Sequence, residues 1–253
     1  MRKDVAAVVV THGSVPELDD CLAALAPQVG EIIVVSNPPA PVSLPEGVSL
    51  VANKRAAGFA ANANRGFAMT TAPFVVVANP DTKAAPDAVA ALRDFLAGRP
   101  RCGIAGPRLL NPDGTWQASR RRFPTVSGTL VRRTPARWLL RPQQRQRSHY
   151  MFDEQPTAPA EADWLLGAFL MLRRELIDEL GGFDAGFRLY GEDIDLCYRA
   201  AKAGWERWYV PDAVVFHEHQ AVTDNRFLTR RTLWHWGAIL RFVRKHPERL
   251  RKL

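Results

Sequence analysis

The first third of the chain alternates short, continuously apolar runs with segments in which apolar residues recur at helical spacing. The apolar runs are rich in β-branched residues, which is typical of strands buried on both faces of a parallel sheet. The intervening segments predict helices that cover those faces, so the pattern as a whole predicts an α/β domain. The expected strands are residues 5–10, 32–35, 48–51 and 74–78, and the expected helices run to about residue 25 and over about residues 59–69.

Polar side chains follow three of these strands at the points where the strands end. In open parallel sheets, ligands collect at the carboxyl ends of the strands, so these side chains are expected to face one binding cleft. They are Thr11, His12, Ser36, Asn37, Asn79 and Asp81.

The pattern is less regular beyond residue 80. Residues 120–162 lack clear periodicity and are rich in Arg, Gln and Pro, which favours a partly mobile loop or excursion, and order is expected to resume at Trp164. The remaining expected elements are helices over about residues 87–96 and from the acidic loop to about residue 203, and strands near residues 103–105, 207–210 and 213–216.

The C-terminal segment has the pattern of an amphipathic helix. Apolar residues between positions 227 and 243 fall largely on one helical stripe, with arginines and lysines around it and Pro247 after it. Two interpretations stay open, because such a helix either lies on an anionic membrane surface or packs against its own domain.

The net charge is concentrated in the same segment. The chain of 253 residues has a formal net charge of +8, and residues 226–253 alone hold nine basic residues and one acidic residue. A second basic stretch, residues 120–147, holds nine arginines and no acidic residue. This asymmetry indicates an anionic partner, and a membrane surface, a phosphorylated substrate and nucleic acid are the alternatives.

The cysteines and the lengths of the apolar runs indicate the cellular compartment of the protein. Cys21, Cys102 and Cys197 are odd in number and widely spaced, which favours a reducing, cytoplasmic environment over a disulfide framework. The first apolar run is too short for the core of a signal peptide, and the longest later run is far shorter than the roughly 20 residues that span a bilayer. The sequence therefore predicts a soluble or peripheral protein.

Three carboxylates lie within four residues at the start of a predicted helix: Glu192, Asp193 and Asp195. Acidic side chains are favoured in the first turn of a helix because they face the positive end of its dipole, but capping requires only one of them. Clustered carboxylates raise one another's pKa, so Asp193 is a candidate general base, with Glu192 and Asp195 orienting it or capping the helix.

A second polar cluster, Asn79-Pro80-Asp81-Thr82, directly follows an apolar strand. A carboxylate at this position suits a hard cation such as Mg²⁺ or Mn²⁺ that bridges substrate phosphates, although the four residues also form an ordinary turn sequence. His217 follows a later strand and is able to reach a cleft from there. The chain has no H-x-x-x-H pair, which argues against zinc.

Several catalytic motifs are missing from the sequence. The chain contains no G-x-G-x-x-G and no G-x-x-x-x-G-K-[ST], which argues against dinucleotide redox chemistry and P-loop chemistry. It also contains no G-x-S-x-G, so an α/β-hydrolase site is not indicated.

Six motifs, taken in order, resemble the family 2 glycosyltransferases over about residues 5–223. They are Val8-Val9-Val10-Thr11-His12, residues 58–66, Asn79-Pro80-Asp81-Thr82, Trp164-Leu165-Leu166-Gly167-Ala168 with Arg173-Arg174, residues 182–199, and Val210-Pro211-Asp212. Within that family, Pro112-Asp113-Gly114 and residues 119–124 are most similar to bacterial rhamnosyltransferases.

The resemblance implies a GT-A fold, an α/β architecture with a Rossmann-like, mostly parallel central sheet and helices on both faces, and the residue pattern adds a C-terminal amphipathic helix. It implies a glycosyltransferase domain over residues 1–223, with a nucleotide-binding half at residues 1–110 and an acceptor-binding half at residues 111–223. Residues 224–253 would then form the basic amphipathic helix.

The resemblance also implies a reaction, which is the inverting transfer of one sugar from a dTDP- or UDP-sugar to a lipid-linked or cell-envelope polysaccharide acceptor. The expected sugar is rhamnose or another deoxyhexose. Asp81 would bind a divalent metal, Mg or Mn, with His217 beside it, and Asp193 would be the catalytic base. Donor contacts would come from Thr11, His12, Ser36, Asn37, Asn64, Asn79 and Asp81, and acceptor contacts from Trp164, Gly167, Ala168 and Glu192.

Two positions depart from the family pattern. Ser36-Asn37 stands where the family usually has Asp-Asn, which weakens an acceptor for the base or ribose of the donor, and His12 replaces a more usual Tyr. Neither departure affects Asp81 or Asp193, so we expect an active enzyme.

Three alternatives remain from the residues themselves. A nucleotidyltransferase also uses an open α/β sheet and a metal, but residues 11–14 lack the expected Gly-rich phosphate loop with a basic residue. A nucleic-acid-binding protein would use the arginine-rich stretches, although few aromatic residues interleave them. A catalytically silent binding protein has only Ser36 in its favour.

We therefore expect a cytoplasmic glycosyltransferase, peripheral on the inner face of the membrane and without a nucleic-acid partner, and a homodimer is left open.

Overall fold

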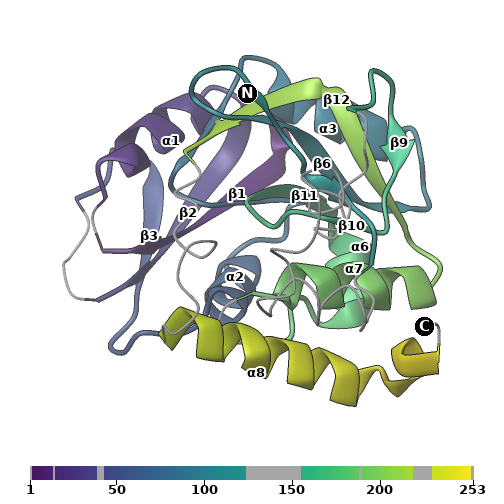
Figure 1. The fold of residues 1–253 in the computed structure, drawn as a ribbon. Coiled ribbons are helices and arrows are strands. Elements are labelled where there is room, and N and C mark those ends of the chain that lie inside the picture. The colour runs from purple at the N-terminus through teal and green to yellow at the C-terminus, as the bar shows by residue number, and fades with distance from the viewer. Residues whose placement is uncertain are drawn as a thin grey trace.

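A computed structural model of the chain describes residues 2–13, 15–38, 43–123, 155–187, 190–218 and 230–251. A single large sheet forms its centre, with strand order β3-β2-β1-β4-β11-β6-β12-β5 (Figure 1). Strand β7 pairs with β6, β9 pairs with β12, and β8 and β10 form a separate two-stranded sheet.

The strand bounds are β1 (Arg2–His12), β2 (Val29–Asn37), β3 (Val48–Ala52), β4 (Phe74–Ala78), β5 (Thr82–Ala84), β6 (Cys102–Leu110), β7 (Trp116–Gln117), β8 (Arg120–Arg121), β9 (Ala160–Glu161), β10 (Trp164–Leu165), β11 (Phe169–Arg173) and β12 (Glu206–His217). The helix bounds are α1 (Glu17–Leu25), α2 (Phe59–Phe67), α3 (Ala88–Ala97), α6 (Arg174–Leu180), α7 (Glu192–Lys202), α8 (Arg230–Lys245) and the 3₁₀ helix η2 (Pro247–Arg251).

The first four strands of the sequence are parallel, and β1, β2 and β4 are buried between two layers of helices. Val5, Ala7 and Val9 face the layer that contains α1 and α3, whereas Val8 and Val10 face the layer that contains α2, α6 and α7. This alternation explains why these strands are continuously apolar, since each face of the sheet is covered. The predicted α/β fold is confirmed, and the predicted strand 74–78 matches β4.

Helix α2 packs unusually close to strand β1. A Cβ atom placed on Gly66 would lie 2.2 Å from Cγ1 of Val8, so only glycine allows this approach. The contact holds α2 directly against β1.

Strand β11 runs antiparallel between β4 and β6 and joins the two halves of the chain in one sheet. The sequence pattern assigns no strand to these residues. Their side chains are apolar at four consecutive positions, and all four are buried because helices cover both faces of the sheet here as well.

The two strands predicted at residues 207–210 and 213–216 are one strand in the structure, so that prediction is wrong in number. Strand β12 runs through both segments, with a register irregularity between Val210 and Val214. Pro211 lies within the irregularity. Its missing N–H therefore does not remove a hydrogen bond from the regular β-ladder.

The arginine-rich excursion predicted over residues 120–162 falls mostly outside the described residues, because residues 124–154 are not described. The structure places β8 at its beginning and β9 near its end. Strand β8 pairs with β10, and β9 pairs with β12, so both ends of the excursion are anchored on strands of residues 164–217.

Helix α8 packs along the helical layer next to α7 (Figure 1). Ala238 and Phe242 are buried and form an apolar cluster with Phe187, against which Ile194 and Tyr198 also pack. The packed interpretation of this segment is therefore observed. Among the described residues, no helix is both long enough and apolar enough to cross a membrane.

Candidate active site

The dipeptide Gly167-Ala168 forms hydrogen bonds with both acidic motifs that the sequence analysis identified. The N–H of Asn79 donates to the carbonyl oxygen of Ala168 at 2.8 Å, and the N–H of Gly167 donates to Oδ2 of Asp193 at 3.0 Å. The Asn79–Asp81 turn follows β4, and Gly167-Ala168 precedes β11, the strand that pairs with β4. The antiparallel pairing of β4 and β11 therefore brings the predicted metal-binding turn and the predicted base together.

Asp193 is held in the first turn of α7 by two backbone donors. Besides the bond from Gly167, Oδ1 accepts the N–H of Ile194 at 2.9 Å. Burial raises the pKa of Asp193 above its ordinary value, and the backbone hydrogen bonds and the nearby charge of Arg121 offset part of that rise. A carboxylate with a raised pKa is a stronger base, which suits proton abstraction from a hydroxyl group.

The side chain of Glu192, next to the candidate base, is buried. Its Oε2 accepts no hydrogen bond from any residue that the structure describes. Burial, followed by the negative charge of Asp193, raises the pKa of Glu192 to about 8. Near neutral pH this side chain is therefore mostly protonated and able to donate a hydrogen bond.

Asp81 and His217 approach each other across the β5–β12 pairing. Thr82 lies opposite His217 in the antiparallel register, and Nε2 of His217 lies 3.5 Å from Oδ1 of Asp81. That oxygen is buried and accepts no hydrogen bond within the described part of the chain. A buried carboxylate oxygen in this state is poised to bind a cation.

Gln117 fixes the tautomer of His217. The Nε2 group of Gln117 donates to the carbonyl oxygen of His217 at 2.7 Å and to Oδ1 of Asn111 at 2.6 Å. Its Oε1 therefore faces Nδ1 of His217, at 2.9 Å, and that nitrogen carries the proton. In the neutral ring the lone pair then lies on Nε2, the atom nearest Asp81, as in histidines that bind metals.

These two side chains fit a divalent metal that completes its shell with substrate oxygens. In the described ranges, no group of three or more His, Cys, Asp or Glu side chains forms a closed metal site. Mg²⁺ and Mn²⁺ sites in phosphate-handling proteins are commonly built from one or two carboxylates with phosphates and water. Asp81 and His217 are the residues that would hold such an ion here.

The predicted donor residues at the ends of β1 and β2 lie side by side. Thr11 pairs with Ser36 and His12 with Asn37 in the parallel register. Thr11 is buried and its hydroxyl donates to the carbonyl of Gly13, whereas His12 is exposed. Ser36 is buried and its hydroxyl donates to the carbonyl of Asn37 at 3.3 Å. Their contacts with a donor stay a prediction.

The amide of Asn37 holds a neighbouring loop in place. It donates to the carbonyl of Ala57 at 3.0 Å, and its Oδ1 accepts from the backbone N–H of Ala57 and from Asn53. Asn53 also donates to Oδ1 of Asn62, a fully buried side chain on α2. Sequence reasoning missed Asn62, although it lies in the glycine-flanked segment that carried part of the family resemblance.

Asn64 connects the two halves of the protein. Its Nδ2 donates to the carbonyl of Phe183 at 2.7 Å, and its Oδ1 accepts the N–H of the same residue at 2.9 Å. Both polar groups of the amide are thereby used on the loop before α7. The donor contact expected of Asn64 stays a prediction, and the observed contacts tie α2 to the loop before α7.

Of the predicted acceptor residues, Gly167 is the one that contacts Asp193 through a hydrogen bond. Trp164 is buried, its indole N–H donates to the carbonyl of Arg122, and the Arg121 guanidinium lies 5.1 Å from its ring centre. Gly167 contacts Asp193 directly, and Ala168 is buried beside it. Their contacts with an acceptor stay a prediction, as does that of Glu192.

We expect Gly167→Ala to lower kcat for sugar transfer by about ten- to hundredfold, because small displacements of a reacting group have effects of this size. A Cβ atom at Gly167 would lie 3.2 Å from Cβ and 3.4 Å from Oδ2 of Asp193, so the base must shift. Steady-state kinetics measure the effect. Gly98→Ala, at a glycine whose added Cβ would meet no atom closer than 3.4 Å, is the control. Equal kcat values for the two variants would contradict the expectation.

Comparison with known proteins shows the family of the chain. Residues 74–252 match the family model described as Glycosyl transferase family group 2. The match covers more than half of the chain and includes Asp81, Gly167, Asp193 and His217. The chain belongs to the family 2 glycosyltransferases. The resemblance inferred from the six motifs is thereby confirmed.

The curated proteins similar to this glycosyltransferase include rhamnosyltransferases. N-acetylglucosaminyl-diphospho-decaprenol L-rhamnosyltransferase of Mycobacterium tuberculosis is 35% identical over 154 residues, which are 60% of this chain and 49% of that protein. Rhamnosyltransferase WbbL of Escherichia coli is 40% identical over 83 residues, 32% of this chain and 30% of that protein. The chain spans about half the length of the mycobacterial relative.

Solved structures share the fold of this glycosyltransferase. The mannosyltransferase PcManGT of Pyrobaculum calidifontis, in complex with GDP-Man and Mn²⁺, superposes with a TM-score of 0.61 and 18% identity, covering 96% of this chain and 65% of that chain. GalNAc-T7, with UDP, GalNAc and Mn²⁺, superposes with a TM-score of 0.60 and 16% identity, covering 84% of this chain and 43% of that chain. The predicted GT-A fold is confirmed.

Proposed function

We propose that the protein transfers one sugar, with inversion at the anomeric carbon, from a nucleotide-diphosphate donor to a hydroxyl group of a lipid-linked or cell-envelope polysaccharide acceptor. The sugar is rhamnose or another deoxyhexose. The observation that carries the proposal is the Gly167-Ala168 link, which holds a candidate metal carboxylate, Asp81, and a candidate base, Asp193, around one short segment.

In this proposal Asp193 takes the proton from the acceptor hydroxyl. The hydroxyl oxygen forms a bond to the anomeric carbon as the bond from that carbon to the nucleotide diphosphate breaks, and the diphosphate leaves with the bonding electrons. The raised pKa of Asp193 favours the proton transfer, and its two backbone donors hold the carboxylate in one orientation. Glu192 in its neutral form is suited to donate a hydrogen bond to the acceptor.

A divalent metal, Mg²⁺ or Mn²⁺, would be held by Asp81 and His217. When bound, such an ion neutralises negative charge on the departing diphosphate. The buried Asp81 oxygen and the Nε2 lone pair of His217 are the features that support it, together with the Mn²⁺ present in both solved structures of the same fold.

The name of the mycobacterial relative supports both the sugar and the acceptor. That protein is named for transfer of L-rhamnose to N-acetylglucosaminyl-diphospho-decaprenol, a lipid-linked diphosphate sugar. We accordingly propose an acceptor of the same chemical class, with a dTDP- or UDP-linked donor. A homodimer remains a prediction.

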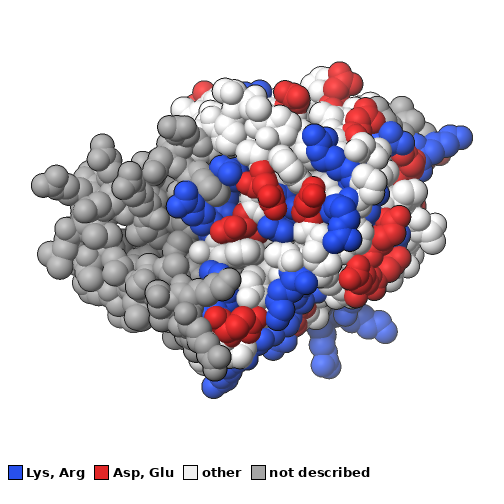
Figure 2. All heavy atoms as spheres, turned by 90° about the vertical axis from the view of Figure 1, so that its right-hand side faces the viewer, with Lys and Arg blue, Asp and Glu red and all other residues white. Residues whose placement is uncertain are grey.

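Basic and acidic side chains are mixed on one face of the described part of the protein. Figure 2 shows the face that carries β9 and the C-terminal end, where Lys and Arg lie interspersed with Asp and Glu among the described residues. Nucleic-acid sites gather basic side chains along a groove or stripe, and most of the arginine-rich stretch that could do so lies outside the described residues, so the expected absence of a nucleic-acid partner stays a prediction.

A panel of nucleotide sugars tests the proposed function. With Mg²⁺ or Mn²⁺ present, we expect one class of nucleotide sugar to raise the thermal unfolding midpoint and to be hydrolysed slowly without acceptor. If no nucleotide sugar binds under these conditions, the proposal is wrong.

We also propose that the outer side of α8 lies on an anionic membrane surface. Leu240 is 49% exposed on that helix, and Trp236, one turn before it, is partly exposed. Leu240→Glu is expected to weaken binding to anionic vesicles by about tenfold, because it removes apolar contact and adds a repelled charge. Vesicle flotation measures this, and Leu50→Glu, at a leucine 42% exposed on β3, is the matched control. A parent protein that stays unbound, or equal losses in both variants, would contradict membrane docking.

A further inference from the structure

A buried carboxylate on α7 connects the helix of the candidate base to the C-terminal segment. Asp195 is fully buried. Nε of Arg199 lies 2.7 Å from its Oδ2, and Nζ of Lys245 and Nε2 of His246 lie 2.9 and 2.8 Å from its Oδ1. Burying a carboxylate is costly unless such partners replace its lost hydration. Lys245 and His246 therefore help to fix where Asp195 lies.

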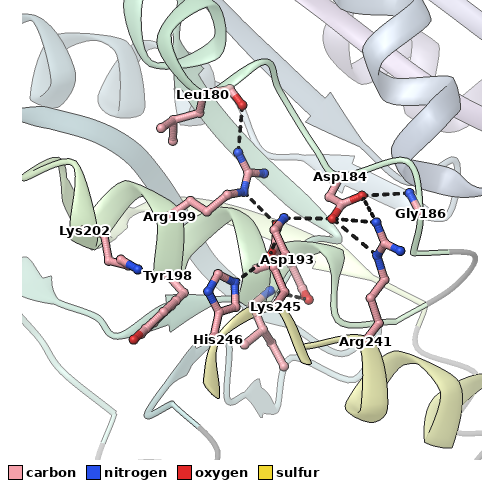
Figure 3. A network of polar contacts seen from close by, with 12 residues as sticks. Leu180, Asp184, Gly186, Asp193, Tyr198, Arg199, Lys202, Arg241, Lys245 and His246 are labelled. Carbon is pink, nitrogen blue, oxygen red and sulfur yellow. Dashed lines mark hydrogen bonds and ion pairs between the residues drawn. The ribbon is translucent and has the colours of Figure 1, made fainter. Parts of the chain in front are cut away.

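The same segment holds the loop that leads into α7. Nζ of Lys245 lies 2.7 Å from Oδ2 of Asp184, and Nη2 of Arg241 lies 2.7 Å from its Oδ1 (Figure 3). Burial alone would raise the pKa of Asp184, but the hydrogen bonds from Arg241, Lys245 and the N–H of Gly186 outweigh burial and hold it well below its usual range. Lys245 thus bridges the carboxylate of the loop and the carboxylate of the helix.

Arg199 completes the connection from within α7. Besides Asp195, its guanidinium donates to the carbonyl oxygen of Leu180 at 2.9 Å (Figure 3) and to that of Gly182 at 2.7 Å. These carbonyls lie where α6 ends and the loop begins. The loop, α7 and the end of α8 are therefore joined through one set of ion pairs.

Ring packing reinforces these ion pairs. The His246 ring centre lies 4.6 Å from that of Tyr198 and 4.9 Å from that of Phe242. The Tyr198 hydroxyl donates to Oε1 of Glu248 at 3.0 Å, just beyond His246 in sequence. The chain after α8 is thus seated on the outer side of α7.

Asp193 and Asp195 point to opposite sides of α7. An α-helix turns by about 100° per residue, so side chains two positions apart differ in direction by about 200°. Asp193 faces Gly167 on one side, and Asp195 faces Lys245 and His246 on the other. A rotation of α7 that loosened the Asp195 contacts would also move the Asp193 carboxylate.

We infer that the C-terminal segment is a positioning element of the catalytic site, in which Lys245 and His246 act through Asp195 to fix the orientation of α7 and hence of Asp193. The kinetic part of this inference rests on the proposed function, in which Asp193 is the base. Lys245 and His246 are positioning residues, because they contact the helix of the base rather than the reacting atoms.

Two variants with matched controls test the kinetic consequence. We expect Lys245→Met to lower kcat for transfer by about ten- to hundredfold while the dissociation constant of the donor stays unchanged, because the donor half is not touched. Lys245→Arg should restore most of the loss. Arg244→Met removes the same charge from an exposed neighbour that has no ion pair with any described residue, and it should behave like the parent.

His246→Phe is the second variant and keeps the ring packing with Tyr198 and Phe242 while removing the contact to Asp195. It should lower kcat in the same way, and His246→Gln should recover part of it. Thermal unfolding confirms that each variant is folded. Parent-like kcat in both Lys245→Met and His246→Phe would overturn the inference.

Hydrogen exchange without any substrate tests the same inference independently of the proposed function. Lys245→Met and His246→Phe should accelerate amide exchange in the first turns of α7, and Arg244→Met should not. If the parent transfers no sugar, the proposed function fails, and exchange still decides whether the segment holds α7. Unchanged exchange in both variants would overturn the positioning role.

Discussion

Asp193→Asn is expected to lower kcat for sugar transfer by about 10²- to 10⁴-fold, the range typical of a lost general base, while donor binding stays at the level of the parent. The amide keeps the size of the carboxylate and is able to accept the Gly167 N–H, which lies 3.0 Å from Oδ2, but it cannot take a proton from the acceptor. Steady-state transfer and calorimetric binding of the nucleotide sugar separate the two effects.

The pH dependence of the parent gives a second signature of the same residue. Burial raises the pKa of Asp193 above the 3.8 of an ordinary aspartate. A base acts only when deprotonated, so kcat should be lost as the pH falls through that raised value, at a higher pH than for an exposed aspartate.

The control for Asp193→Asn is Asp178→Asn, which changes a largely exposed carboxylate on α6. Equal kcat for Asp193→Asn and this control would exclude Asp193 as the base.

Asp81→Asn is expected to remove metal-dependent donor binding and to lower transfer by about 10²- to 10⁴-fold, since a metal supplies several kcal/mol of charge stabilisation and each ~1.4 kcal/mol is a factor of ten. The buried Oδ1 of Asp81, beside Nε2 of His217, is the atom that would bind the cation. A neutral amide removes the charge that attracts it.

Calorimetry with Mn²⁺ and nucleotide measures this loss directly, apart from activity. A chelator should reduce the parent to the level of Asp81→Asn and should change that variant little. Metal affinity and transfer that survive in Asp81→Asn would show that the cation is bound elsewhere.

The parts of the fold with strong local patterns were predictable. Strand β4 and the polar turn after it follow from a run of buried β-branched residues ended by Asn79 and Asp81. The acidic start of α7 was visible for the same reason, because three carboxylates after several glycines are informative within a short window. These two segments contain the metal-site and base candidates.

The contacts between distant segments were not predictable from the pattern. Strand β11 is a short apolar run whose antiparallel place between β4 and β6 depends on the whole sheet. Gln117 has no distinctive signal, since its importance comes from the two carbonyl oxygens that orient its amide beside His217. The family resemblance supplied a role for Asp193 but did not indicate what holds its helix.

The C-terminal segment shows the same limit most clearly. Its amphipathic pattern allowed both membrane docking and packing, and only the structure shows Lys245 and His246 on Asp195. Buried ion pairs between residues far apart in sequence depend on the packing of two helices, so spacing along the chain carries no trace of them.

The most direct test of the account is a transfer assay with the parent and Asp193→Asn side by side. The assay supplies dTDP- and UDP-linked sugars, including dTDP-rhamnose, with Mg²⁺ or Mn²⁺ and an N-acetylglucosaminyl-diphospho-polyprenol acceptor, and mass spectrometry identifies the product. We expect the parent to add one deoxyhexose to the acceptor, and Asp193→Asn to bind the same donor without forming product. Product formation by Asp193→Asn at the rate of the parent, or a parent that transfers no sugar from any of these donors, would contradict the account.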